Sequence, residues 1–229
     1  MKTQPWLLSP LLIFFIAGLV LGQTYPTNIG HRSRRWQRPS PPSPPQEQTY
    51  PTNIRYQSSW EEFPSLRNKI GSIIGIAPFR DDRSERLYVG HQSGLRSVSN
   101  YFKSEPFPLE KAISDSLSQA VSRLGMKTVP IHDWDGKAES LKSMGVDSVL
   151  AIEITRFWTE GMAAGNATKV ITSVYLTIRL GVKKEGRVFT KRAYVMKERT
   201  IPTLTPEEVE RTLNRNLAGI LDDFLFNPY

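Results

Sequence analysis

Three side chains in one short stretch are the first candidates for chemistry in this sequence. His132, Asp133 and Asp135 almost adjoin, and imidazole and carboxylate groups are the ligands that a zinc-type site uses. However, all three fall on one expected loop, and no second histidine follows at the spacing of a metal motif. The cluster therefore favours a loop cap or the entry to a helix, and a metal-dependent hydrolase is the least favoured alternative.

A second polar cluster, Asp81-Asp82-Arg83, follows an apolar segment at residues 70–79. Carboxylates at the end of a strand can be catalytic, but an Asp-Asp-Arg turn favours local ion pairing and an Asx-turn. The chain has no glycine-rich phosphate motif and no cysteine, which excludes disulfides and thiolate metal sites. The sequence therefore predicts a protein that is not an enzyme and that binds no cofactor.

Several large apolar side chains lie where strands are expected to end or within a long polar loop at residues 80–108. If they are exposed, they would mark a contact with a protein or a lipid; ordinary core packing is the alternative. These candidate partner-binding residues are Phe157, Trp158, Met162, Phe102 and Phe107.

The elements that must position these residues follow from the hydrophobic periodicity. Alternating or continuous apolar residues predict strands at 70–79, 127–131, 146–158, 170–182 and 187–199, and helical spacing predicts helices at 109–124, 138–144 and 206–224. Thr205 and Glu208 form a capping box at the start of the last helix, with Pro206 at its first position. The order β-α-β-α-β-β-β-α predicts an α+β fold, a mixed five-stranded sheet with helices packed on one face.

The first 22 residues have the pattern of a signal sequence. Lys2 is followed by an apolar run from Leu11 to Leu21, and Gly22 allows a cut before Gln23. The run is shorter than the roughly 20 residues that span a bilayer, although an uncleaved anchor is the alternative. The expected location is therefore exported, either in the periplasm or associated with the membrane of the cell envelope.

Residues 23–65 are expected to form a disordered, proline-rich tether before a single domain at residues 66–229. The heptapeptide Gln-Thr-Tyr-Pro-Thr-Asn-Ile occurs twice, at 23–29 and 48–54, and is interpreted as a duplication that lengthened the linker. The formal net charge of +8 is concentrated before the domain, in the cluster Arg32, Arg34, Arg35 and Arg38. This cluster predicts attraction to an anionic membrane surface, whereas the nearly balanced domain argues against nucleic acid.

The segment Ile74-Gly-Ile-Ala-Pro-Phe-Arg-Asp-Asp-Arg83 resembles the first-strand motif of YajG-like bacterial envelope lipoproteins. The resemblance spans about Ile70 to Phe226 and implies a fold similar to the TolB amino-terminal domain and to LpoB-like proteins. LpoB-like proteins carry a proline-rich tether and a domain that activates a peptidoglycan synthase. Gln23 departs from the family pattern, because the lipid-bearing residue there is a cysteine.

These observations predict a non-enzymatic, exported envelope protein whose tethered domain binds another envelope protein. Two alternatives remain. One is a lipid or hydrophobic-ligand accessory of an envelope transporter, suggested by Phe157 and Trp158. The other is the hydrolase at His132, Asp133 and Asp135.

Overall fold

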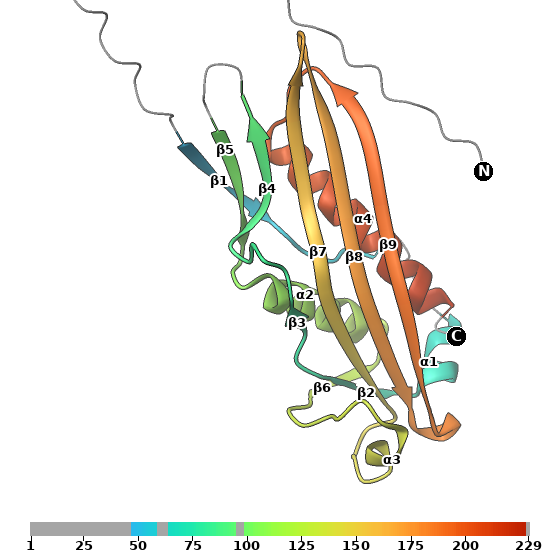
Figure 1. The fold of residues 1–229 in the computed structure, drawn as a ribbon. Helices are drawn as coiled ribbons and strands as arrows, with labels where there is room; N and C mark the ends of the chain where they lie inside the picture. The colour runs from blue at the N-terminus through green and yellow to red at the C-terminus, as the bar shows by residue number, and fades with distance from the viewer. Residues whose placement is uncertain (1–46, 59–63, 95–98, 228–229) are drawn as a thin grey trace, which may run out of the picture. The chain divides into compact units, whose positions relative to one another are not determined.

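The computed structural model of the chain describes residues 47–58, 64–94 and 99–227. Three long antiparallel strands dominate it (Figure 1): β7 (Ser148–Ala164), β8 (Ala167–Val182) and β9 (Arg187–Ile201). Every second residue of β8 is buried in the stretch that holds Val174, Leu176 and Ile178, as the strict alternation in the sequence predicts. The three predicted C-terminal strands are therefore confirmed, and each is longer than predicted.

On its other edge, β7 is lined by three short strands that follow one another along it. These are β2 (Ile73–Ile76), β3 (Arg80–Asp81) and β4 (Tyr88–Ser93), and all three run parallel to β7. The sheet continues from β2 to β6 (Lys127–Pro130) and from β4 to β5 (Ser99–Glu105). A further strand, β1 (Glu47–Asn53), pairs with β5 in parallel.

Within the part of the chain that the structure describes, the sheet therefore has nine strands rather than the predicted five. The four missed strands are β1, β3, β4 and β5. β3 is only two residues long, and β4 and β5 are rich in polar residues, so the segment 80–108 has the composition of a loop. β4 and β5 each bury only one large apolar side chain, Val89 and Phe102, so neither segment shows a hydrophobic period.

The predicted tether boundary is wrong for residues 47–58, which belong to the sheet-bearing unit Ser43–Tyr229. Pro51 is tolerated in β1 because β1 pairs with β5 alone, at the edge of the sheet. The predicted signal sequence, the arginine cluster and the first heptapeptide lie outside the described residues.

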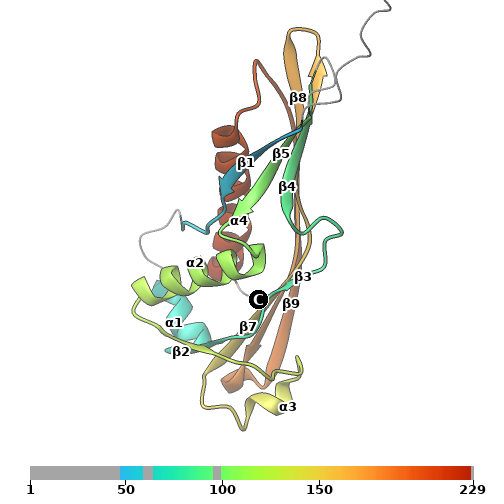
Figure 2. The same cartoon turned by 90° about the vertical axis from the view of Figure 1, so that its left-hand side faces the viewer.

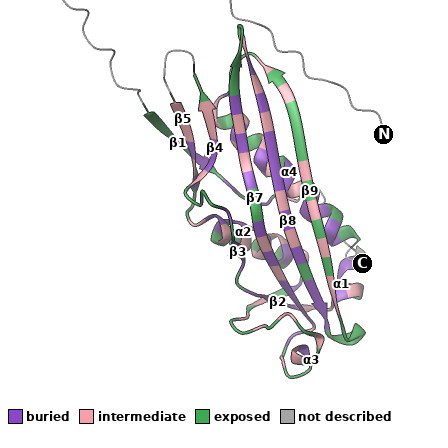
Figure 3. Cartoon of the chain, in the orientation of Figure 1, coloured by how far each residue is buried: buried purple, intermediate pink, exposed green. Residues whose placement is uncertain are grey.

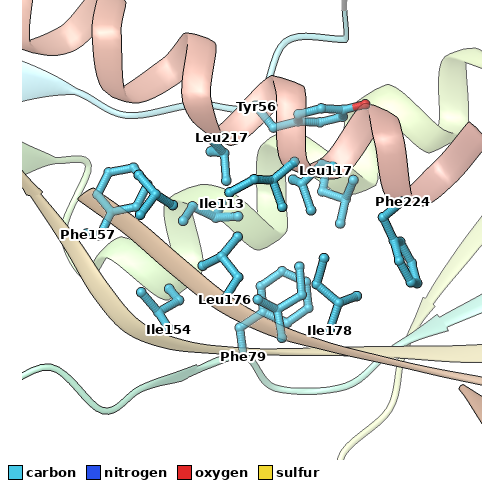
Figure 4. Close-up of a cluster of buried hydrophobic side chains, with 14 of the residues drawn as sticks. Tyr56, Phe79, Ile113, Leu117, Ile154, Phe157, Leu176, Ile178, Leu217 and Phe224 are labelled. Carbon is cyan, nitrogen blue, oxygen red and sulfur yellow. The ribbon is translucent and has the colours of Figure 1, made fainter. Parts of the chain in front are cut away.

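Three helices cover one face of the sheet (Figure 2): α1 (Pro64–Ile70), α2 (Leu109–Arg123) and α4 (Pro206–Phe226). α1 was not predicted. Thr205 caps α4 as predicted, because its side chain accepts a hydrogen bond from Glu208 N at 3.3 Å. The main core lies between the sheet and the helices (Figure 4), where Ile113 and Leu217 are fully buried. Each such side chain contributes about 1.5–3 kcal/mol through burial.

The fourth helix, α3 (Ala138–Leu141), packs on the opposite face, at one end of the hairpin. It does so through Gly181, where an added Cβ would lie 2.8 Å from Leu141 and 2.9 Å from Trp134. Leu141 and Val149 form a second, smaller core there. The prediction that helices lie on one face therefore holds for α1, α2 and α4, and α3 is the exception.

Candidate interaction surface

Beyond α3, no helix of the described residues covers the second face of the sheet over much of β7, β8 and β9, and Figure 3 shows exposed and half-buried residues between the buried ones along these strands. Tyr194 and Met196 lie on this face because residues paired across antiparallel strands point the same way, and they pair with Tyr175 and Ser173. Tyr194 is 77% exposed and Met196 is 65% exposed. Two large apolar side chains thus stand in solvent, one pleat apart on the edge strand.

Rings of neighbouring strands continue this surface. Tyr175 meets Tyr194 edge to face, with ring centroids 6.1 Å apart. On β4 and β5, Tyr101 lies 5.0 Å from Tyr88 and 4.8 Å from His91. We call the whole set the aromatic face: Tyr88, His91, Tyr101, Trp158, Tyr175, Tyr194 and Met196.

Glu160 of β7 joins the two halves of the aromatic face. Trp158 Nε1 donates to one oxygen of its carboxylate at 2.7 Å, and His91 Nδ1 lies 3.3 Å from the other. These polar contacts fix the two rings against the sheet, so the surface is held in shape before any partner arrives. A preorganised surface of this kind loses little entropy on binding.

Some of the charges next to the aromatic face are paired, whereas Arg192, on the same face of β9, has no carboxylate partner among the described residues. Lys169 lies 2.8 Å from Glu198, Arg179 lies 3.6 Å from Glu153, and all four side chains are at least partly exposed. An anionic ligand such as nucleic acid would need an excess of free positive charge on the surface. Aromatic, methionine and arginine side chains are instead enriched at protein interfaces.

The structure separates the five predicted partner-binding residues. Phe157 and Phe102 lie in the main core with 0% and 1% exposure, so neither can touch a partner of the folded domain. Trp158 is half-buried on the aromatic face, and Met162 is 37% exposed farther along the same side of β7. Phe107 is 53% exposed between β5 and α2, away from the strands of the hairpin.

Phe157 and Trp158 lie on opposite faces of the sheet because neighbouring residues of a strand point to opposite sides. The same rule could have found Tyr175 and Tyr194, which occupy the polar face of clearly alternating strands. Tyr88 and Tyr101 could not be found in this way, because their strands were expected to be loops.

The Asp-Asp-Arg cluster is structural. The side chains of Asp81 and Arg83 are 1% and 5% exposed, and two hydrogen bonds of 2.7 and 2.8 Å join them. Arg83 also donates to the carbonyl oxygens of Tyr88 and Phe157. Its backbone N–H donates to Asp81 Oδ1 at 3.2 Å, which is the predicted Asx-turn. With these partners the pair ties β3 to β4 and β7.

The His-Asp-Trp-Asp segment leads into α3, which agrees with the predicted helix entry, although the N-cap residue is Lys137 and no side chain caps the helix. Asp135 Oδ1 accepts hydrogen bonds from Ser140 Oγ at 2.6 Å and from Lys137 N at 3.0 Å. The first of these bonds is the main reason that the pKa of Asp135 is lowered. Within the described ranges, no group of three or more His, Cys, Asp or Glu side chains is arranged to hold a metal ion.

A cleft of about 760 Å³ lies between residues 53–58 and α2. Ser116 is the residue of α2 that brings a hydroxyl to this cleft. Its Oγ donates to the Ala112 carbonyl and accepts a hydrogen bond from Tyr56 N. No histidine is among the described residues that line the cleft, so the lining offers no Ser–His pair. Across residues 47–58, 64–94 and 99–227, no helix is long and apolar enough to cross a membrane.

Three solved structures show likeness to this chain. A DUF330-family protein from Xanthomonas campestris has 14% identity and a TM-score of 0.48, with 77% of this chain and 92% of that chain covered. Lipoprotein GNA1162 from Neisseria meningitidis has 14% identity, a TM-score of 0.27 and coverages of 66% and 99%. The LpoB C-terminal domain from Salmonella enterica has 11% identity, a TM-score of 0.23 and coverages of 56% and 85%.

No family model matches the chain, and no curated protein matches it significantly in sequence. All three structural likenesses are below 15% identity. The function is therefore argued from the residues of this chain alone.

Proposed function

We propose that this chain is a non-enzymatic, exported envelope protein and that its domain binds another envelope protein through the aromatic face. The observation that carries the proposal is the pair Tyr194 and Met196, which stand 77% and 65% exposed on one face of β9. Exposed apolar side chains that lie next to one another, here continued by half-buried rings, are typical of a contact surface. Export rests on the signal pattern of residues 1–22.

The chemistry of the surface favours a protein over the alternatives. Tyrosine, tryptophan and methionine are enriched at interface centres, and Lys169 and Arg179 are paired with carboxylates. The lipid-accessory alternative is weakened because Phe157 and Phe102 are buried in the core and cannot contact a lipid. The hydrolase alternative is weakened because Asp135 Oδ1 already accepts two hydrogen bonds, from Lys137 N and Ser140 Oγ.

The proposal is tested by capture of partners from chemically crosslinked envelopes with the tagged full chain. We expect the wild-type chain to recover a reproducible envelope protein and the variant Tyr194→Ser/Met196→Ser to lose most of it, because two central contacts are removed. Phe107→Ser is the matched control, since Phe107 is also an exposed apolar residue but lies outside the aromatic face.

Loss of capture in Phe107→Ser, with normal capture by the double variant, would move the binding surface to the β5–α2 connection and overturn the proposal. A vesicle-binding experiment distinguishes the proposal from the lipid-accessory alternative. We expect the double variant to sediment with phosphatidylglycerol–phosphatidylethanolamine vesicles to the same extent as the wild type; a large loss would support the lipid accessory instead.

A further inference from the structure

The duplicated heptapeptide acquires a structural meaning because its second copy is strand β1. Gln48–Asn53 pair in parallel with β5, from Asn100 to Glu105, and Ile54 N extends the ladder by donating to Glu105 O at 3.0 Å. The same seven residues occur 25 positions earlier, at Gln23–Ile29. The chain thus carries two identical sequences for one position in the sheet.

The contacts that hold β1 come largely from the heptapeptide itself. Ile54 is fully buried in the main core, Thr52 is also 0% exposed, and the ring of Tyr50 stacks on Phe102 at 6.2 Å. Each of these side chains has an identical counterpart in the first copy, which are Ile29, Thr27 and Tyr25.

Helix α4 completes the site through the backbone. Asn53 N donates to Glu210 Oε2 at 3.2 Å, and Asn53 O accepts from Asn214 Nδ2 at 2.9 Å. Because these bonds use main-chain atoms, Asn28 can make both. Residues of β5 and α4 therefore form a site that recognises the heptapeptide and not its place in the chain.

We propose that Gln23–Ile29 is an alternative occupant of the β1 site in the same chain, exchanging with Gln48–Ile54 beside β5. The occupant comes from the same chain because a linked segment of this length has an effective concentration in the millimolar range. A second molecule reaches such concentrations only in very dense solutions. This proposal is independent of the aromatic face.

The residues after the heptapeptide decide which copy prevails. Tyr56 is 3% exposed, its hydroxyl donates to Asp222 at 2.6 Å, and its backbone N–H donates to Ser116 Oγ at 2.9 Å. The residue at the equivalent place in the first copy is His31, which is smaller and does not reproduce a buried phenol. The second copy is therefore the resident strand, and the first is a minor state.

The exchange changes the reach of the domain from its N-terminal side. With the second copy in the site, residues 23–46 precede the sheet, and as polyproline they would span about 75 Å. With the first copy in the site, Gln23 itself lies in the sheet, and that spacer is removed. The duplication thus provides two tether lengths in one chain.

Disulfide trapping tests the exchange cleanly because the chain has no native cysteine. Asn53 and Glu105 are exposed partners across β1 and β5, and the contacts described for both use backbone atoms. In the full chain, Asn53→Cys/Glu105→Cys reports the resident strand and Asn28→Cys/Glu105→Cys reports the exchanged one. His31→Cys/Glu105→Cys is the out-of-register control.

We expect the 28–105 disulfide, quantified by peptide mass spectrometry after mild oxidation, to exceed the 31–105 disulfide at least about tenfold. Adding Tyr56→His should raise the 28–105 yield by about tenfold or more, since the resident copy loses its buried anchor. Adding Tyr25→Asp/Ile29→Asp should abolish the 28–105 link, and the same pair of changes should leave the 53–105 link unchanged.

Equal yields of the 28–105 and 31–105 disulfides would overturn the proposal. A 28–105 link found mainly in disulfide-bonded dimers at low micromolar concentration would also overturn it, in favour of exchange between two molecules. Thermal unfolding of each variant under reducing conditions shows whether it folds. The Tyr25→Asp/Ile29→Asp variants still test the proposal if Tyr56→His does not fold.

Discussion

At the scale of single residues, the Arg83–Asp81 pair is the interaction on which the middle of the sheet depends. Arg83 donates to the Asp81 carboxylate and also to the carbonyl oxygens of Tyr88, Phe157 and Arg86. The pair connects three strands at the point where β3 gives way to β4. The sequence made the same turn a candidate for catalysis. In the structure both side chains are buried and hydrogen-bonded to each other, which indicates a structural role.

We predict that Arg83→Met lowers the free energy of unfolding by about 3–5 kcal/mol, because it leaves the Asp81 carboxylate buried without its partner. The double variant Asp81→Leu/Arg83→Met should recover most of that loss, since no buried charge remains. Urea denaturation of the wild type and the two variants measures both effects. A single variant within 1 kcal/mol of the wild type would show that the pair is not structural.

Asp147 provides a pH-dependent contribution at the start of β7. Its Oδ2 accepts hydrogen bonds from Ile73 N at 2.9 Å and from Ser72 N at 2.8 Å. These bonds, with that of Ile73 the largest cause, hold the pKa of Asp147 below its ordinary value of 3.8. The folded state therefore favours the charged carboxylate, and β2 is clamped to the loop before β7.

A carboxyl group with a lowered pKa stabilises the fold fully above its ordinary pKa and loses that effect as the pH falls through the folded value. We predict that Asp147→Asn costs about 1–2 kcal/mol at neutral pH and that its difference from the wild type shrinks below a pH of about 4. Urea denaturation at pH 7, 4 and 3 measures this. Asp133→Asn, at an exposed loop position, is the control and should differ little from the wild type at each pH.

At the scale of elements, the sequence predicts those parts whose residues bury an apolar face. β7, β8 and β9 alternate clearly, and α2 and α4 carry apolar stripes, so their positions follow from periodicity. β4 and β5 are short and polar because only one of their faces meets the core, and β1 contains a proline. Their place in the sheet depends on partners that are distant in sequence, which local composition does not encode.

The interaction surface has the same origin. The sequence placed apolar candidates at strand ends, and two of the five lie in the core because Phe102 and Phe157 face the helices. Tyr194 and Met196 become visible as a surface only when the register of β8 and β9 brings them onto the uncovered side. Pairing, rather than residue type, therefore decides which aromatic residues are exposed.

Helix α3 offers a test of packing on the second face. We predict that Gly181→Ala destabilises the domain by about 1–3 kcal/mol, because the new methyl group would lie 2.8 Å from Leu141 and 2.9 Å from Trp134. Gly219→Ala is the matched control: it lies on the exposed side of α4 with no atom close to the new Cβ, and it should stabilise by about 0.5–1 kcal/mol. Thermal unfolding that ranks the two variants the other way would show that α3 does not dock on Gly181.

At the scale of the whole molecule, the domain is a sheet with two unlike faces. One face is sealed by α1, α2 and α4 around the main core, and the other is covered at one end by α3 and open along much of the hairpin (Figures 1 and 2). The open face carries aromatic residues together with charged residues, some of which form ion pairs. The main core therefore lies on one side of the sheet, and the partner contact that we propose lies on the other.

The most direct test of this account compares two neighbouring residues that face opposite sides of β9. A photoreactive amino acid is placed at Met196, on the aromatic face, or at Lys197, which is exposed but points to the other side. The full chain is irradiated in intact cells, and crosslinked products are identified by mass spectrometry. We expect a reproducible crosslink to an envelope protein from position 196 and not from position 197. Equal crosslinking from both positions, or crosslinking from position 197 alone, would contradict the proposed role of the aromatic face.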